Sequence, residues 1–274
     1  MDGEGYSKMM IEKITEEDIP WIHNLQPDGW LDIVPHFRFY LKNSEWCNPV
    51  KVKVDNRLVG IGCGLSFQQT GWLGHIIVAP DYRKQGIGSF IVNSLCNLLE
   101  NKGIQTISLV ATEFGYPVYR KAGFVEETEY LFFEREKVLA PCSSPHIVHF
   151  SHQNREEMIS LDKMVSGEAR ENLLKQYLQN SYLYIRNHQV SGFYIPDLGE
   201  GLIIADTSEA GIELMKLRYS NVNKGAVPIN NSAAIQFLKD NGFKESRRMK
   251  RMILGNTLQW KPKNLFNRIA GNLG

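Results

Sequence analysis

The chain has 274 residues, about the length of one large or two small domains. Hydrophobic residues make up 43% of it and charged residues 22%, a composition typical of soluble globular proteins. The 31 basic and 30 acidic residues leave a net charge of +1, which provides no strong field for binding nucleic acid or an anionic membrane.

Membrane, secretion and metal signals are absent from the sequence. No apolar run is long enough to span a membrane, and the first ten residues lack the apolar core of a secretion signal. The four cysteines, Cys47, Cys63, Cys96 and Cys142, have neither CxxC spacing nor flanking histidines. We therefore expect free thiols, no bound metal and a cytoplasmic location.

Strand-like and helix-like segments alternate from Met10 to Arg135, which favours an α/β fold with a mixed sheet covered by helices. Strands are expected at residues 10–14, 50–54, 58–64, 72–78, 104–110 and 124–134. Helices are expected after a cap at Thr15, over residues 89–101 and over residues 117–122.

A Pro- and Ser-rich stretch at residues 140–145 predicts a linker, and hence one domain over 1–140 and another over 141–274. The second half has helix-like stretches at 155–165 and 168–179, and strand-like stretches at 182–186 and 202–205. Gly242-Phe243 repeats Gly123-Phe124 at an offset of 119 residues, which indicates that the two halves are related. The tail after Gly255 is compatible with a final helix or with a frayed end.

Residues 78–89, Val-Ala-Pro-Asp-Tyr-Arg-Lys-Gln-Gly-Ile-Gly-Ser, carry the clearest functional pattern. Gly86 and Gly88 allow close backbone approach where a strand leads into a helix, and the helix dipole favours an anion there. Arg83 and Lys84 add positive charge, so the segment predicts a diphosphate site. The alternative is a flexible turn with two solvated basic residues, but the spacing and context favour binding.

This loop, together with Tyr119-Arg120-Lys121-Ala122-Gly123-Phe124, resembles the GNAT (Gcn5-related N-acetyltransferase) superfamily over roughly residues 10–135. The resemblance implies tandem GNAT-like domains, each a mixed, mostly antiparallel sheet flanked by helices, with the second domain degenerate. It also implies that strand 72–78 splays from strand 104–110, with acetyl-CoA in the cleft. The residues implied to bind acetyl-CoA are Ile76, Ile77, Val78, Arg83, Lys84, Gln85, Gly86, Ile87, Gly88, Ser89 and Thr112.

The activity implied is transfer of an acetyl group from acetyl-CoA to a primary amine of a small molecule or peptide by direct attack. A backbone N–H near Ile77 or Val78, freed by the splay, is the expected donor to the developing oxyanion. Tyr119 is the expected general acid for the departing CoA thiolate. The alternative for Tyr119 is a core tyrosine at the end of a helix.

A general base is not evident from the sequence, and a base that acts through a relaying water is an equally good alternative to a side chain in direct contact. Some family members place a Glu or His at the positions that Trp72 and Gly74 occupy here. His75 is one residue off, and alternation turns it to the opposite face unless the strand bulges, so we interpret it as structural. Other residues in the region over the implied acceptor pocket, interpreted as surface or packing residues, are His23, Asp28 and His36.

Trp30 and Trp72 are the residues expected to line an apolar acceptor pocket.

In the second half, Leu238 stands where the first half has Tyr119, and Asp206 and Glu209 would repel a diphosphate, so we predict no CoA site there. A non-catalytic acyl-CoA-binding or regulatory module is the main alternative function, and an interaction protein that docks through the second half is another. The sequence leaves the acceptor and the oligomeric state open.

Overall fold

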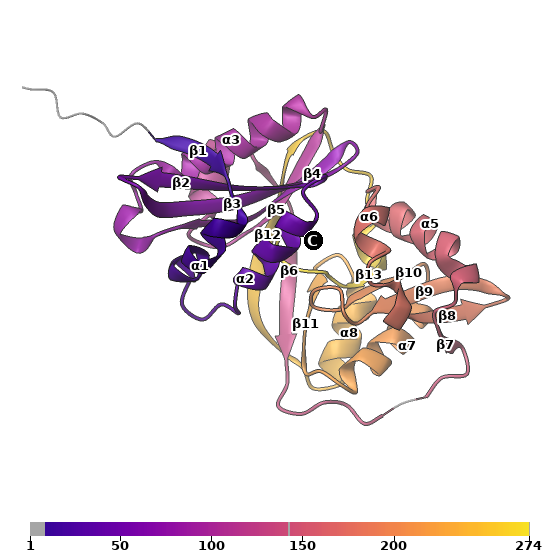
Figure 1. Cartoon of the computed structure of the whole chain (residues 1–274). Coiled ribbons are helices and arrows are strands. Elements are labelled where there is room, and N and C mark those ends of the chain that lie inside the picture. Colours follow the sequence, from indigo (N-terminus) through magenta and orange to yellow (C-terminus); the bar gives the residue numbers. More distant parts are fainter. Residues whose placement is uncertain (1–8, 142, 274) are drawn as a thin grey trace, which may run out of the picture. The chain divides into compact units, whose positions relative to one another are not determined.

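The structure, a computed structural model, describes residues 9–141 and 143–273 and contains two compact units (Figure 1). The first unit runs to Val125 and also contains Ile253–Asn256. The second contains Glu126–Met252 and the residues from Thr257 onward. Each unit has sheet and helices, as the α/β expectation requires.

A mixed sheet forms the centre of the first unit. Its first four strands are antiparallel neighbours in chain order, and the fifth lies parallel to the fourth. The C-terminal end of a later strand lies beside the fifth strand, and next to it the Asn256 amide donates to the Gln105 carbonyl (2.9 Å). These strands are β1 (Met10–Lys13), β2 (Cys47–Val54), β3 (Arg57–Phe67), β4 (Thr70–Val78), β5 (Thr106–Ala111) and the last residues of β12 (Lys244–Gly255).

Helices cover both faces of this sheet (Figure 1). Gly60 and Gly62 of β3 face α3 (Ile87–Asn101), since a Cβ atom on either glycine would lie 2.8 Å from the Ile91 side chain. The glycines therefore let the helix pack closely on the strand. Phe37 and Tyr40 of α2 (Val34–Lys42) are fully buried on the other face. The short helices of this unit are α1 (Ile19–Ile22) and α4 (Tyr116–Lys121).

The second unit has a five-stranded antiparallel sheet in the order β13-β10-β9-β8-β7, and a further run of strands in the order β12-β6-β11. Its strands are β6 (Val125–Glu134), β7 (Ile147–His149), β8 (Tyr182–Arg186), β9 (Gln189–Ile195), β10 (Leu202–Ala205), β11 (Lys224–Pro228), β12 and β13 (Leu265–Asn267). Its helices are α5 (Arg155–Ser166), α6 (Glu171–Leu174), α7 (Ser208–Tyr219) and α8 (Ser232–Asp240).

The tail after Gly255 is neither a helix nor a frayed end. It contributes β13, in which Asn267 lies opposite Ile203 of β10, and Phe266 is 1% exposed in the core of the second unit. A strand of three residues is too short to show a period in the sequence, so only its pairing partner reveals it.

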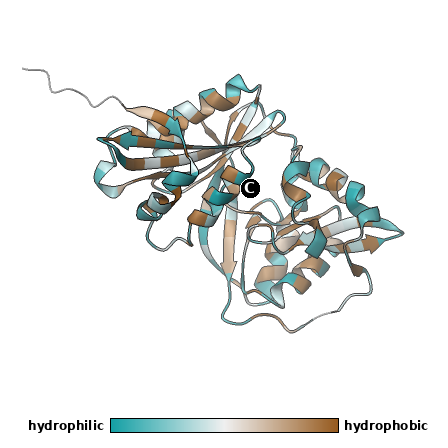
Figure 2. Cartoon of the chain, in the orientation of Figure 1, coloured by the Kyte–Doolittle hydropathy of each residue, from teal (hydrophilic) through white to brown (hydrophobic). Residues whose placement is uncertain are grey.

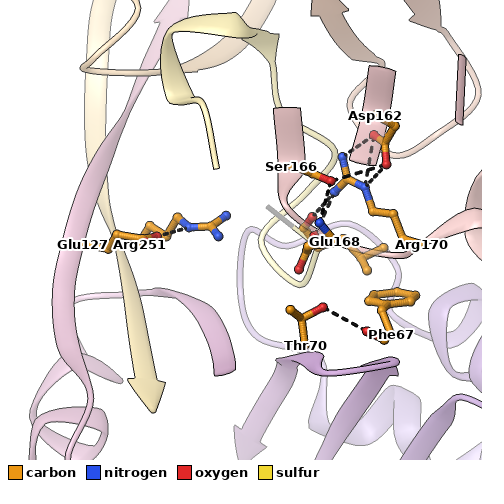
Figure 3. A network of polar contacts seen from close by, with 9 residues as sticks. Phe67, Thr70, Glu127, Asp162, Ser166, Glu168, Arg170 and Arg251 are labelled. Carbon is orange, nitrogen blue, oxygen red and sulfur yellow. Dashed lines mark hydrogen bonds and ion pairs between the residues drawn. The ribbon is translucent and has the colours of Figure 1, made fainter. Parts of the chain in front are cut away.

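A buried cluster of charges lies at the start of the helix expected over residues 168–179, and this helix does not form as one element. Arg170 donates to both carboxylate oxygens of Asp162 (2.8 and 2.9 Å) and contacts Glu168 (3.3 Å), with all three residues buried (Figure 3). Burial opposes the charge on Arg170, but the two carboxylates outweigh it and raise its pKa. The structure has two short helical segments here, α6 and a 3-10 helix at Leu178–Asn180, in place of one long helix.

The helices α3, α5 and α7 carry both hydrophobic and hydrophilic residues (Figure 2), as expected for helices that pack on a sheet with one face and meet solvent with the other. Within the described part of the chain, no helix combines the length and apolarity needed to cross a membrane.

Cys47, Cys63 and Cys96 are buried free thiols, as expected, whereas Cys142 lies outside the described residues. No group of side chains suited to a metal ion occurs among the described residues.

Candidate active site

The two central strands of the first unit separate as the resemblance implies. β4 and β5 pair only between Thr70–Trp72 and Thr106–Ser108. β4 then continues to Val78 and β5 to Ala111 without a further ladder between them. The amide and carbonyl groups along the free edge of β4 are therefore available to a ligand.

A β-bulge lies in the splayed part of β4. The register runs from Cys63 opposite Gly74 to Ile61 opposite Ile77, so two residues of β4, His75 and Ile76, face the single Gly62 of β3. His75 adopts a φ of 53°, which is unusual for a residue with a side chain.

The bulge turns His75 toward α2. Trp72 lies on that face because its partner Leu65 is next to Gly64, which faces α3. Regular alternation would turn His75 toward α3, yet its ring lies 5.8 Å from that of Phe37 on α2. The expectation that His75 faces away from the acceptor side is thus wrong, because the extra residue in the bulge shifts the alternation by one.

One amide of β4 points away from β3 beyond the bulge. The Ala79 amide donates to the Val59 carbonyl (2.8 Å), and Ile77 lies opposite Ile61. Because hydrogen-bonded pairs alternate along an antiparallel ladder, the Ile77 amide is directed to β3 and the Val78 amide to the free edge. Of the two amides that the sequence suggested as oxyanion donors, the geometry favours that of Val78.

The glycine loop leads from β4 into the N-terminus of α3. Gly86 has a φ of 87° and Lys84 a φ of 61°, two left-handed residues that turn the chain into the helix. The first helical bond runs from the Phe90 amide to the Gly86 carbonyl (2.9 Å), so the amides of Ile87, Gly88 and Ser89 have no partner within the helix.

These features fit a diphosphate. A Cβ atom on Gly88 would come no closer than 3.8 Å to Val78, and one on Gly86 would meet nothing within 4 Å. The protein itself therefore leaves open space at the amides of the loop, into which an anion can fit.

The side chains of the loop differ in whether they bond to the loop itself or face solvent. Arg83 donates from Nε to the Val78 carbonyl (3.1 Å), and Gln85 donates to the Asp81 carbonyl (3.0 Å). Both bonds hold the loop in shape. Lys84 is exposed, and so its ammonium group is open to a phosphate oxygen.

The helix α4 presents the predicted tyrosine. Tyr119 is 8% exposed, and burial raises the pKa of its hydroxyl, which therefore stays protonated at neutral pH. A Cβ atom on Gly115 would lie 2.7 Å from the Tyr119 ring, so this glycine makes room for it. Thr112 accepts a hydrogen bond from the Gly115 amide at its Oγ1 (3.1 Å) and thereby fixes the start of the helix.

The two tryptophans expected to line an acceptor pocket differ in exposure. Trp30 is 45% exposed in the loop before α2, and its ring lies 6.3 Å from that of His75. Trp72 is completely buried in β4. Of the two, only Trp30 therefore has side-chain surface that a molecule from solvent can reach.

An aromatic and histidine cluster surrounds His75. Its Nδ1 lies 2.7 Å from the Tyr40 hydroxyl, and its ring centroid lies 4.7 Å from that of His36. Burial, and then the neighbouring His36, lower the pKa of His75 to about 3. The sequence did not assign Tyr40 to a site, because an aromatic residue at helical spacing reads as core. Of the other sequence candidates, His23 and Asp28 are exposed.

The corresponding helix start in the second unit is built differently. The Thr207 hydroxyl accepts from the Ala210 amide at the start of α7 (3.3 Å). Glu209 lies in the first turn, where Arg186 (2.8 Å) and the Tyr184 hydroxyl (3.1 Å) bind its carboxylate. Side chains of the protein thus already occupy the positive end of this helix.

Fold and site together define a class of protein in which two α/β units share one chain, and parted central strands lead into a glycine loop at a helix N-terminus. The chain belongs to the GNAT acetyltransferase family. Residues 10–124 match the model of the Acetyltransferase (GNAT) family, and residues 158–267 match that of an Acetyltransferase (GNAT) domain.

Two solved structures support the tandem arrangement. A putative acetyltransferase from Pyrococcus horikoshii is similar with a TM-score of 0.82 and 22% identity, over 100% of this chain and 99% of that one. A tandem GNAT protein from the clavulanic acid biosynthesis pathway is similar with a TM-score of 0.61 and 13% identity, over 90% and 98% of the two chains. At these levels of sequence identity, the similarity to the two structures is evidence for the fold alone.

Two curated proteins are similar over shorter segments. Glucosamine 6-phosphate N-acetyltransferase of Trypanosoma brucei brucei is 33% identical over 54 residues, which are 20% of this chain and 37% of the relative. The uncharacterized protein YyaT of Bacillus subtilis (strain 168) is 30% identical over 81 residues, 30% of this chain and 55% of the relative. The matches thus span little more than a third and about half of these relatives.

Proposed function

We propose that the protein is an N-acetyltransferase that moves an acetyl group from acetyl-CoA to a primary amine. One working site lies in residues 1–140, and residues 141–274 form a degenerate domain that supports it. The observation that carries the proposal is the continuity of the splayed edge of β4 with the glycine loop and the open amides of α3.

Acetyl-CoA would bind along this path. The amides from Gln85 to Ser89 and the Lys84 ammonium would hold the diphosphate, with Arg83 shaping the loop. The free edge of β4 at Ile76–Val78 would hold the pantetheine arm, with Thr112 at the end of β5. The bound molecule supplies an activated acetyl group as a thioester.

Two groups of the chain then serve the transfer. The Val78 amide donates a hydrogen bond to the carbonyl oxygen as negative charge develops on it, a contribution typically worth about 10²–10³ in rate. Tyr119 gives its proton to the departing sulfur, a role that its raised pKa permits throughout the neutral range.

The acceptor would be a small molecule or a peptide with a primary amine, bound on the α2 side of β4 beside Trp30 and above Trp72. The short similarity to a glucosamine 6-phosphate N-acetyltransferase makes glucosamine 6-phosphate one probe. The aromatic surroundings make tryptamine a second, and a tripeptide with a free N-terminus a third.

Titration calorimetry with acetyl-CoA, followed by a thiol-release assay with these three amines, tests the proposal. Binding of acetyl-CoA and amine-dependent release of CoA are the expected results. Binding without transfer to any amine would favour a non-catalytic acyl-CoA-binding module instead. Absence of binding at millimolar acetyl-CoA would refute both.

A further inference from the structure

We infer that His75 accepts, at Nε2, the proton that the acceptor amine loses during transfer, and that Tyr40 is the positioning residue that orients the imidazole. The inference rests on the proposed function and assigns a further residue to the same site. Its starting point is the bulge in β4, which places an imidazole on the α2 side of the strand.

The conformation of His75 calls for a reason. A left-handed backbone inside a strand is unfavourable for a residue with a side chain, and it persists only where its surroundings impose it. Bulges next to active sites re-aim side chains. Here the re-aimed side chain lies one to three residues before Ile76–Val78, where the thioester carbonyl would lie, and next to the exposed Trp30.

The hydrogen bond to Tyr40 fixes which nitrogen is available. A neutral imidazole has one N–H and one bare nitrogen, and the partner of the first sets the tautomer. In our assignment Nδ1–H donates to the Tyr40 oxygen across 2.7 Å, which leaves Nε2 bare. No hydrogen bond joins Nε2 to any residue that the structure describes.

The charged and titratable neighbours of His75 are few. On α2 these are Tyr40 and His36, and Asp32 acts on His36 from the loop before that helix. Cys63 of β3 lies on the same face, and burial holds its thiol protonated. Asp32 acts on His36, and no carboxylate is among the groups that act on His75 itself, so the imidazole is neutral and able to accept a proton.

A weak base is sufficient for this step. The amine nitrogen becomes cationic as its bond to the carbonyl carbon forms, and in that state it is far more acidic than a free ammonium. The proton passes from this nitrogen to Nε2 as the carbon–sulfur bond breaks, and the sulfur receives a proton from Tyr119. The products are the amide and the CoA thiol, after which the proton on His75 returns through solvent to Tyr119.

The left-handed φ of His75 determines which substitutions remove the imidazole without straining the backbone. His75→Gly removes the imidazole at a φ that glycine adopts freely, and His75→Asn keeps a residue that tolerates this φ but is a much weaker base. His188→Gly is the matched control, since His188 is an exposed histidine with a φ of 63° in the turn between β8 and β9. Each variant is first tested for acetyl-CoA binding by calorimetry and for folding by thermal denaturation.

Turnover is then measured with the fastest of the three amines. We expect a fall in kcat of about 10²-fold for His75→Gly and His75→Asn, with acetyl-CoA affinity unchanged, and wild-type kcat for His188→Gly. Added imidazole should restore kcat of His75→Gly at least about tenfold and leave His75→Asn unchanged, because only the glycine variant has space for it.

The outcomes separate the two proposals. If the wild type does not bind acetyl-CoA or acetylates none of the amines, the proposed function fails and the role of His75 falls with it. If the wild type turns over and the folded His75 variants keep their kcat, only the role of His75 is wrong. A lowered kcat that imidazole does not restore would also overturn it, since a purely structural role predicts that result.

The positioning role of Tyr40 is tested by measuring the tautomer of His75. In ¹⁵N spectra of histidine-labelled protein without substrates, we expect a bare Nε2 and a protonated Nδ1 for His75 in the wild type. Tyr40→Phe should shift the tautomer balance and lower kcat about tenfold with KM unchanged. A protonated Nε2 in the wild type would overturn the assignment, and so would an unchanged tautomer in a folded Tyr40→Phe variant.

Discussion

Tyr119 and Leu238 occupy equivalent positions in the two halves of the chain. The carbonyl of Tyr119 accepts from the Phe124 amide (3.1 Å), and that of Leu238 accepts from the Phe243 amide (3.0 Å). In each case the intervening helix ends at a left-handed glycine, Gly123 or Gly242. The offset of 119 residues is thus confirmed in backbone geometry, and only the first helix carries a hydroxyl at this position.

Tyr119→Phe is expected to lower kcat by about 10²–10⁴ without changing the affinity for acetyl-CoA. The variant keeps the buried ring and loses only the proton that the leaving sulfur needs. Because burial raises the pKa of Tyr119, wild-type kcat should show no loss from its ionisation between pH 7 and about 10. Tyr177→Phe, a half-buried tyrosine of the second unit, is the control, and equal turnover of both variants would remove Tyr119 from the mechanism.

Acetyl-CoA should bind with a stoichiometry of one. In the second unit Thr207 caps the Ala210 amide at the start of α7, and Glu209 places a carboxylate in its first turn that repels a diphosphate. Titration calorimetry of the whole chain measures the number of sites directly. Two equivalents per chain would contradict this view of the second unit.

Gly88→Ala should separate binding from stability. Gly88 lies in the first turn of α3, where a methyl group meets no described atom closer than 3.8 Å, so the variant should be more stable by about 0.5–1 kcal/mol. The same methyl group would project into the space assigned to the diphosphate and weaken acetyl-CoA binding at least about tenfold. Calorimetry and thermal denaturation measure the two effects.

Asn93→Ala, an exposed change further along α3, is the control for Gly88→Ala and should leave affinity unchanged. Wild-type affinity in Gly88→Ala would mean that the diphosphate does not lie against this turn.

The ion pair of Asp18 with Lys51 should make the first unit sensitive to acid. Lys51 donates to Asp18 across 2.6 Å with both side chains nearly buried, and the Thr15 amide donates to the same carboxylate (2.8 Å). Burial alone would raise the pKa of Asp18, but the bonds from Lys51 and Thr15 outweigh it and hold the pKa below the usual 3.8. The pair therefore stabilises the fold above about pH 4, and its contribution is lost as the pH falls through the lowered pKa.

Asp18→Asn should lower the free energy of unfolding by about 3 kcal/mol at pH 7 and reduce its dependence on pH below 4. Urea denaturation at a series of pH values measures both effects. The double variant Asp18→Asn with Lys51→Met should be more stable than Lys51→Met alone, because it leaves no uncompensated buried carboxylate. An unchanged acid limb in Asp18→Asn would show that another carboxylate governs acid unfolding.

The sequence predicted the local features well where one residue type has one physical role. Gly86 and Gly123 are left-handed as their turns require, and the helix ending at Asn101 and the strand ending at Val78 end where their patterns placed them. The functions assigned to Lys84, Thr112 and Tyr119 remain predictions that the experiments above address.

The sequence predicted less well in the second half of the chain. Residues 168–179 do not form one helix, since α6 covers only Glu171–Leu174. The tail forms β13 because it pairs with the edge of β10, which lies far from it in the sequence. That partner is not visible in a local window.

By itself, then, the sequence determined the tandem family membership, the glycine loop and the absence of Tyr119's counterpart at Leu238, since these depend on residue identity and short spacings. The tertiary structure decided the face on which His75 lies and its contact with Tyr40, 35 residues away in the chain. The physical reason is that a bulge arises from the register between two strands, here β3 and β4, and register is a property of the pair rather than of either strand.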